Sequence, residues 1–397
     1  MNNITENLVE KEFDVIYQTY KRLPIVIDRA EACRIYDTQG EVYLDFLSGI
    51  AVNALGHSHP NIIRAVEEQI RKYMHVSNYF YQKPQIDLAE KLIKHSGLKK
   101  VFFSNSGTEA IEGAVKLVRK WGNQNGKNKI IAFSGGFHGR TYGALSIMDK
   151  PQYKDFMGPF LPDTEILPYN DITTLMERIN SDIAAVFIEY VQGEGGVSEP
   201  EHEFNCLLNE LHQQHGFLLV ADEVQTGFGR TGKFFGFEHF NAKPDIITIA
   251  KGMGGGLPLG GIIAGERTEN IWAKGNHGST YGGNAVACST GLVVVEMLEQ
   301  GLLEHVVEIG NYFEDELKKC ADKFPKLINN VRGRGLMRGL LLSFDAQILV
   351  NELLQRRVIA NAASGNVLRI VPPLIVGMQE IDEFMTKLSD ALTKLSD

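Results

Sequence analysis

Lys251 follows an apolar run and is surrounded by glycines in AKGMGGGLPLGG, residues 250–261. Glycines at the end of a strand allow a ligand to approach the backbone closely. In a partly dry pocket the pKa of a lysine falls, and its neutral amine becomes a nucleophile toward carbonyl groups. A solvated lysine beside a flexible turn would have the same local sequence, so this motif alone leaves both interpretations open.

Asp222 ends the apolar run FLLVAD, residues 217–222. An acid at the carboxyl end of a parallel strand lies at the edge of the sheet where ligands bind. A buried carboxylate is costly unless a cation meets it, and a protonated pyridine nitrogen would be such a cation. The alternative is a helix cap or a surface acid.

The segment SNSGTEA, residues 104–110, follows a short apolar run and opens a helical pattern. Ser106 and Glu109 have the spacing of a capping box. Ser106, Gly107 and Thr108 would place N–H groups and hydroxyls at the helix start, where the helix dipole also favours a phosphate. An ordinary helix cap explains the same residues.

The segment GGFHGRTYG, residues 135–143, combines an aromatic ring, an imidazole and a guanidinium among glycines. Phe137 could stack on a planar ring, and Arg140 could hold a carboxylate through two parallel hydrogen bonds. We interpret His138 as a structural or stacking histidine, because the other histidines and the cysteines have no metal-ligand spacing. No metal site is expected.

Composition and charge exclude several other classes of protein. The chain has 397 residues with 40 Lys+Arg against 49 Asp+Glu, a net charge of −9, which argues against a nucleic-acid or anionic-membrane partner. Its four scattered cysteines form no CxxC pair and predict reduced thiols in a cytoplasmic protein. The polar, acidic start is unlike a signal peptide, and no apolar run has the length of a membrane span.

Two glycine motifs of nucleotide-binding proteins do not fit. GFGRTG, residues 227–232, matches GxGxxG, but other residues separate it from the preceding strand and an aromatic-rich segment follows it. The dinucleotide fingerprint requires strand, glycines and helix in immediate succession. GxxxxGK[ST] is absent from the sequence, so a nucleoside-triphosphatase is not indicated.

From residue 101 onward, short apolar runs alternate with helical patterns, which is typical of a mainly parallel sheet covered by helices. Strands are predicted at 101–104, 130–133, 184–190, 217–222, 246–250 and 261–265, with helices at 109–121 and 203–214. Before this region, 34–46 predicts a hairpin, and 61–73 and 84–95 have amphipathic helical spacing.

A smaller α+β unit is predicted at the C-terminal end. It contains a strongly helical stretch at 284–322, strand candidates at 335–344 and 367–370, and helices at 346–357 and at the end of the chain. We expect residues 1–50 to pack with this small domain, residues 286–397, while residues 51–285 form the large domain. No tether-like linker separates the two.

Taken together and in order, these motifs resemble those of the class III (ornithine-type) aminotransferases. The resemblance runs from TYKRLPIV (19–26) to LRIVPPL (368–374) and includes SGIAVNALGHSHP, SNSGTEA, FHGRTYG, VQGEGG, ADEVQTGFGRTG and HGSTYGGN. It implies the type I α/β fold of these enzymes, the cofactor pyridoxal 5′-phosphate, and a homodimer with the active site at its interface.

Carried over residue by residue, the resemblance implies that Lys251 binds the cofactor covalently and transfers a proton, and that Asp222 pairs with the pyridine nitrogen. The other cofactor-binding residues it implies are Ser106, Gly107, Thr108, Phe137, His138, Val224, Gln225 and, from the neighbouring subunit, Thr280. The substrate-binding residues are Arg140, Glu194, Arg369, Tyr20 and Ser279. Arg369 would bind the α-carboxylate of glutamate or 2-oxoglutarate, Glu194 would pair with Arg369 when the donor is bound, and Arg140 would bind the donor's α-carboxylate.

Within the family, the motifs look most like those of members that transfer the δ-amino group of N-acetylornithine to 2-oxoglutarate in arginine biosynthesis. Ornithine δ-aminotransferases usually have a tyrosine where this chain has Ile50. Free ornithine and succinyldiaminopimelate remain alternative donors, and an aminomutase of the same fold is a further alternative. Tyr190 replaces the proline that is usual in the family. A non-catalytic protein of this fold would be expected to lack Lys251 or Asp222.

Overall fold

The computed structural model describes residues 3–396 and contains three β-sheets. The central sheet has the order β4-β10-β9-β8-β7-β5-β6. Its strands are β4 (Lys100–Ser104), β5 (Lys129–Phe133), β6 (Thr164–Leu167), β7 (Ile183–Ile188), β8 (Leu218–Asp222), β9 (Ile246–Ile249) and β10 (Gly260–Ala264). All neighbours pair in parallel except β10, which is antiparallel to both β4 and β9.

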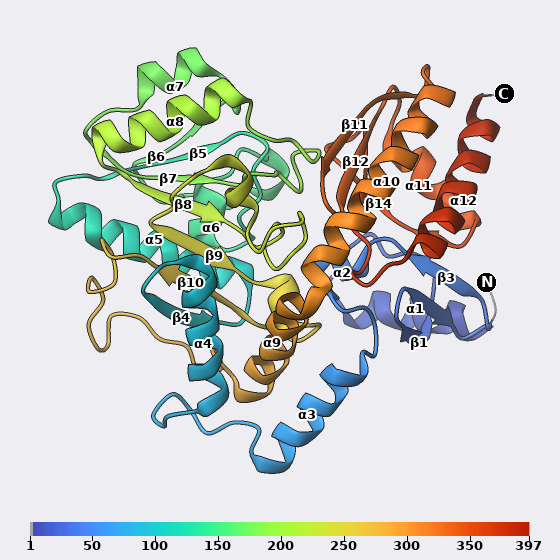
Figure 1. Ribbon diagram of the computed structural model, residues 1–397, viewed down its shortest axis with the longest axis horizontal. Helices are drawn as coiled ribbons and strands as arrows, with labels where there is room; N and C mark the ends of the chain where they lie inside the picture. The colour runs from blue at the N-terminus through green and yellow to red at the C-terminus, as the bar shows by residue number, and fades with distance from the viewer. Residues whose placement is uncertain (1–2, 397) are drawn as a thin grey trace.

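Helices cover both faces of the central sheet (Figure 1), and its inner strands are therefore buried on both sides. On one face lies α5 (Gly107–Gln124), whose apolar side chains form a core with the sheet. The larger core on the other face includes side chains from α4 (Lys83–Ser96), α7 (Ile172–Arg178), α8 (His202–His215) and α9 (Ala285–Met297). The predicted α/β fold, with a mainly parallel sheet covered by helices, is confirmed.

The chain leaves the central sheet through a long apolar helical run, Ala285–Lys323, with enough length and hydropathy to cross a membrane by composition alone. The run is two helices, α9 and α10 (Leu303–Lys323), separated by a π-helical turn at Leu298–Leu302 in which Gly301 has φ 111°. Because α9 packs on α3 (Pro60–Lys72) and α4 and its apolar side chains enter the core, the run is a core element of the fold.

The C-terminal part has its own antiparallel sheet, in the order β11-β12-β15-β14. Its strands are β11 (Ile328–Arg334), β12 (Met337–Leu342), β14 (Asn361–Ala363) and β15 (Val367–Ile370). Helices α10 and α11 (Ala346–Gln355) pack on this sheet, and α12 (Met378–Ser396) packs on both of these helices.

The third sheet joins the two ends of the chain. Strands β1 (Ile27–Glu31), β2 (Arg34–Asp37) and β3 (Val42–Asp45) form an antiparallel meander, and β3 then pairs in parallel with β13 (Val358–Ile359). Figure 1 shows these N-terminal strands beside the C-terminal helices. The remaining α-helices of the described residues are α1 (Asn3–Val15), α2 (Ser48–Ala51) and α6 (Tyr142–Ser146).

Candidate active site

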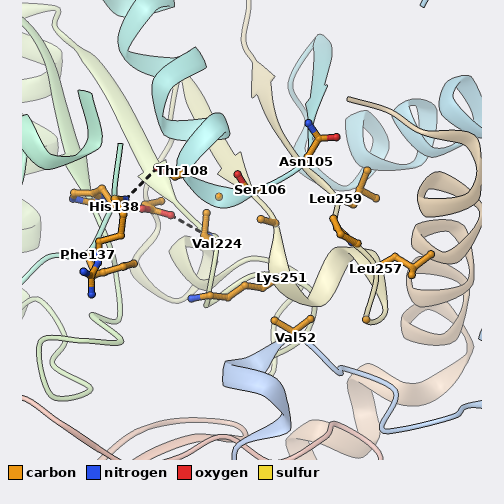
Figure 2. Close-up of a pocket in the computed structure, with 17 residues that line it drawn as sticks. Val52, Asn105, Ser106, Thr108, Phe137, His138, Val224, Lys251, Leu257 and Leu259 are labelled. Atoms are coloured by element: carbon orange, nitrogen blue, oxygen red, sulfur yellow. Dashed lines mark hydrogen bonds and ion pairs between the residues drawn. The ribbon is translucent and has the colours of Figure 1, made fainter. Parts of the chain in front are cut away.

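The carboxyl ends of β4, β5, β8 and β9 meet at one edge of the central sheet and surround a cavity of about 420 Å³. Parallel strands direct their carboxyl ends to one edge, and this is where ligands bind in such sheets. The predicted site residues on the wall of this cavity are Ser106, Gly107, Thr108, Phe137, His138, Arg140, Asp222, Val224 and Lys251. Figure 2 shows Lys251 extending below Val224 on the side where Phe137 and His138 lie.

Three hydrogen bonds hold the Asp222 carboxylate at the base of the cavity. His138 Nδ1 donates to Oδ2 at 2.7 Å, while the Thr248 hydroxyl and the Val224 N–H donate to Oδ1, each at 3.1 Å. Burial disfavours the charged imidazolium, but the hydrogen bond to Asp222 and the negative charges of Asp222 and Glu189 together outweigh burial and raise the pKa of His138 above its ordinary value. His138 is therefore a buried partner of the acid, as expected of a structural histidine, and no cluster of metal ligands occurs within residues 3–396.

Lys251 lies directly after β9, at the first residue of the short 3₁₀ turn Lys251–Gly254. Its φ of 45° is in the left-handed region, which an L-residue adopts at an energetic cost and which is frequent at functional sites. Burial, and then the positive charge of Arg369, lower the pKa of Lys251 from 10.5 to about 8. A larger fraction of its amine is therefore neutral, and nucleophilic, than in a solvated lysine.

The start of α5 forms the opposite wall. Ser106 is the N-cap and its hydroxyl accepts the Glu109 N–H at 3.3 Å, as predicted. The reciprocal bond differs from the expected capping box, because the Glu109 carboxylate accepts the N–H of Asn105 at 2.6 Å rather than that of Ser106. The N–H groups of the first helical turn have no intrahelical partner, so Gly107 and Thr108 present donors to an anion there.

Phe137 and Val224 also line this cavity, and Val224 lies close to the start of α5. A Cβ on Gly107 would lie 2.7 Å from Val224 Cγ1, so only glycine allows the helix to approach this wall. The backbone N–H of Phe137 donates to the buried Glu189 carboxylate at 2.8 Å, which fixes the loop that carries the ring.

Arg369, Glu194 and Gln225 form one hydrogen-bonded group. Arg369 is 1% exposed and its Nη1 donates to Glu194 Oε1 at 2.5 Å and to Gln225 Oε1 at 3.3 Å. Asn361 Oδ1 accepts from Arg369 Nε at 3.1 Å. Burial alone would raise the pKa of Glu194, but the charge and hydrogen bonds of Arg369 lower it below its ordinary value. Gln225 directly follows Val224 on the cavity wall, and the charge of Arg369 also lowers the pKa of Lys251.

Six predicted residues are not on the wall of this cavity: Gln225, Glu194 and Arg369, which form the group just described, and Ser279, Thr280 and Tyr20. Ser279 lies in a neighbouring cavity, where its hydroxyl accepts from Asn105 Nδ2 at 3.3 Å, and Thr280 is exposed beside it. Tyr20 is 73% exposed in the N-terminal segment. Their expected roles stay predictions, and for Thr280 the expected role is in the neighbouring subunit.

Sequence analysis missed several residues that act on this site. Glu189 is buried behind Phe137, and burial raises its pKa to about 7. It follows an apolar strand just as Asp222 does, so the same reasoning could have identified it. Thr248, Asn361 and Tyr153 gave no such signal, because each meets its partner only through tertiary packing.

Tyr190 does not face the cavity, although it replaces the proline that is usual in the family. The side chain is fully buried against the ring of Phe240 at a centroid distance of 5.2 Å. Its hydroxyl has no hydrogen-bond partner among residues 3–396, whereas the hydroxyl of nearby Tyr169 donates to Glu189 O at 3.0 Å.

We therefore expect Tyr190→Phe to raise the free energy of unfolding by about 1 kcal/mol, because it removes an unsatisfied buried hydroxyl. The matched change Tyr169→Phe removes a satisfied hydroxyl and should lower the free energy of unfolding by about 1 kcal/mol. Urea denaturation of both variants measures the difference. A loss of stability in Tyr190→Phe would show that the hydroxyl does have a partner.

The donor set of the cavity suits pyridoxal phosphate. The amine of Lys251, with its lowered pKa, suits the aldehyde of the cofactor. The anchored carboxylate of Asp222 suits the pyridinium nitrogen, and the start of α5 suits the phosphate. Phe137 and Val224 on the wall of the cavity offer apolar contacts to a planar ring.

Comparison with known proteins gives the family. Residues 15–392 match the family described as Aminotransferase class-III. The acetylornithine aminotransferase of Aquifex aeolicus is 44% identical over 95% of this chain and 99% of its own length. That of Methanocaldococcus jannaschii is 41% identical over 98% of this chain and 99% of its own length.

Solved structures agree with this result. The ornithine aminotransferase of Toxoplasma gondii has a TM-score of 0.93 at 28% identity, and the comparison covers 99% of this chain and 96% of that one. The acetylornithine aminotransferase of Elizabethkingia anophelis has a TM-score of 0.88 at 34% identity over 98% and 99% of the two chains. The chain therefore belongs to the class III aminotransferases and is a pyridoxal-phosphate-dependent transaminase.

Proposed function

We propose that this transaminase moves the δ-amino group of N-acetylornithine to 2-oxoglutarate, giving N-acetylglutamate semialdehyde and glutamate. The main support is the set of acetylornithine aminotransferases that are 39–44% identical over nearly the whole chain. The arrangement of arginines around the cavity is compatible with both substrates, because each carries an α-carboxylate.

Bound pyridoxal phosphate supplies an aldehyde that captures amino groups and a ring that delocalises the charge left when a proton is removed. The proposed role of Lys251 is to hold the cofactor covalently and then to move a proton at the δ-carbon of the donor. Its lowered pKa suits this role, since a general base works best when its pKa lies near the working pH. Asp222, oriented by His138 and Thr248, would hold the positive charge of the ring nitrogen.

The same site must accept a donor and then 2-oxoglutarate. Arg369 would bind the α-carboxylate of 2-oxoglutarate, and its ion pair with Glu194 would neutralise it while the donor is bound. Arg140 is exposed at the wall of the cavity and would bind the α-carboxylate of the donor. Exchange of a carboxylate partner at Arg369 thus allows two acids of different length to use one reaction centre.

The active form is proposed to be a cytoplasmic homodimer in which Thr280 of the partner subunit contacts the phosphate. Large apolar side chains that are exposed near the site support this assembly, because exposed apolar groups of this kind mark interfaces. They are Met74, Tyr79, Phe80, Tyr81 and Tyr281. A second cavity, which includes Met74 and Tyr281, shares Asn105, Leu257 and Pro258 with the cavity at Lys251.

Single-turnover loss of the cofactor's visible absorbance tests the proposal. We expect N-acetylornithine to convert the bound cofactor much faster than free ornithine does. Ile50, which precedes Val52 on the cavity wall, stands where ornithine-specific relatives usually have a tyrosine, so Ile50→Tyr is the matched variant. Faster conversion by free ornithine would contradict the proposed donor and favour an ornithine δ-aminotransferase.

A further inference from the structure

The guanidinium of Arg140 is held by aromatic rings alone. Its Cζ lies 3.5 Å from the centroid of the Tyr153 ring and 5.7 Å from that of Phe137. Within residues 3–396 the side chain makes no hydrogen bond or ion pair, and only its backbone N–H is bonded, to Thr108 Oγ1 at 3.3 Å. The N–H donors of Arg140 thus remain available to a ligand at the wall of the cavity.

Tyr153 is fixed behind Arg140 rather than in the cavity itself. It ends the short 3₁₀ turn Pro151–Tyr153 and is half-buried, with its ring perpendicular to that of Phe137 at 6.2 Å. The turn follows Asp149, whose carboxylate accepts the N–H of Gly135 at 3.2 Å. One ring therefore contacts both the aromatic wall and the arginine of the proposed donor site.

A second cation lies near the same ring. Lys150 Nζ is 5.8 Å from the centroid of Tyr153 and donates to the backbone oxygen of Glu194 at 3.3 Å. Tyr153 is thus close to Arg140 and also to the lysine that holds the loop of Glu194. Glu194 pairs with Arg369, so Lys150 lies between the ring of Tyr153 and the second proposed carboxylate-binding arginine.

We propose that Tyr153 is a positioning residue that orients Arg140 toward the donor's α-carboxylate and so makes the enzyme select donors that carry one. The proposal rests on the proposed role of Arg140 in the donor half-reaction. An exposed arginine samples many rotamers, and fixing it in one of them opposes ligand binding. Contact with the face of an aromatic ring restricts those rotamers before the donor arrives and leaves the N–H edge open to the carboxylate.

The test compares two donors that differ only at the α-carbon. N-Acetylputrescine has the ω-amine, the chain and the acetyl group of N-acetylornithine but lacks its carboxylate. In Tyr153→Leu we expect kcat/KM of the donor half-reaction to fall about tenfold for N-acetylornithine, mainly through KM. With N-acetylputrescine it should change by less than about twofold, because Arg140 has no carboxylate to bind.

Three variants complete the experiment. Tyr153→Phe keeps the ring and should restore most of the activity with N-acetylornithine. Tyr142→Leu removes an exposed ring that is two residues from Arg140 but does not stack on it. This variant should leave kcat/KM unchanged for both donors. In an Arg140→Ala background, Tyr153→Leu should add no further loss, because a positioning residue acts only through its partner.

Equal losses with the two donors would overturn the proposal, and so would a full additional loss in the Arg140→Ala background. These results are distinct from failure of the proposed function, which the wild-type enzyme alone reveals. If the wild type prefers free ornithine, the donor is wrong, and ornithine and putrescine then provide the same comparison with and without a carboxylate.

Discussion

Replacing Lys251 with alanine is expected to abolish transamination, with a fall in kcat of about 10⁴-fold or more. The variant loses the amine that holds the cofactor and the group that moves the proton, and general acid–base catalysis alone contributes about 10²–10⁴-fold. Lys251→Arg is the matched control, because it keeps a positive charge that cannot be removed near neutral pH. Steady-state assays with the donor and 2-oxoglutarate measure both variants, and substantial turnover in either would contradict the assignment.

The same substitution should leave the fold intact, as gel filtration and thermal melting can show. Burial disfavours the charged amine, since the pKa of Lys251 is lowered from 10.5 to about 8. In the cofactor-free protein this cost is fully present below pH 8 and disappears as the pH rises toward 10.5. Lys251→Ala removes this cost and should therefore raise the melting temperature more at pH 7 than at pH 10. A melting temperature that falls equally at both pH values would indicate a structural role.

Replacing Arg369 with alanine should lower kcat/KM for 2-oxoglutarate by about 10²-fold or more, with a much smaller effect on the donor half-reaction. Truncating one partner of a buried charge pair costs about 2–5 kcal/mol, and Arg369 is 1% exposed and bonded to Glu194, Gln225 and Asn361. Separate single-turnover measurements of the two half-reactions test the division of roles. Equal losses in both halves would refute it.

Glu194→Gln is the complementary variant. It removes the carboxylate that competes for Arg369, so binding of 2-oxoglutarate should tighten while the donor half-reaction slows. Opposite effects of Arg369→Ala and Glu194→Gln on the 2-oxoglutarate half-reaction would show that Arg369 exchanges Glu194 for the carboxylate of 2-oxoglutarate. Thermal melts are the control for folding, because Glu194→Gln leaves the buried guanidinium of Arg369 without its carboxylate partner.

Much of the central sheet could be predicted because its strands are buried. The apolar runs 101–104, 130–133, 217–222 and 246–250 correspond closely to β4, β5, β8 and β9. The segments at the carboxyl ends of these strands contain most of the residues that line the cavity. A motif that directly follows an apolar run was therefore a good predictor of a site residue. The proposed roles and the domain boundaries after residues 50 and 285 stay predictions.

The missed elements lack that apolar signal. The edge strand β6 is half-buried, and β11 (INNVRGR) is polar with only its first residue buried, so neither forms an apolar run. The break at Gln300–Gly301 interrupts the stretch 284–322, which was expected to be strongly helical. Tyr153 could not be found in the sequence, because its contact with Arg140 depends on how two loops fold over each other.

The pairing of β3 with β13 has a consequence for how the chain is made. Leu44 pairs with Val358, so the first meander completes its sheet only with a strand near the end of the chain. During translation the N-terminal strands would leave the ribosome long before their neighbour exists, with the edge of β3 open to other strands. A nascent chain that stalls within the central sheet would keep this edge exposed, whereas release of the finished chain lets β13 cover it.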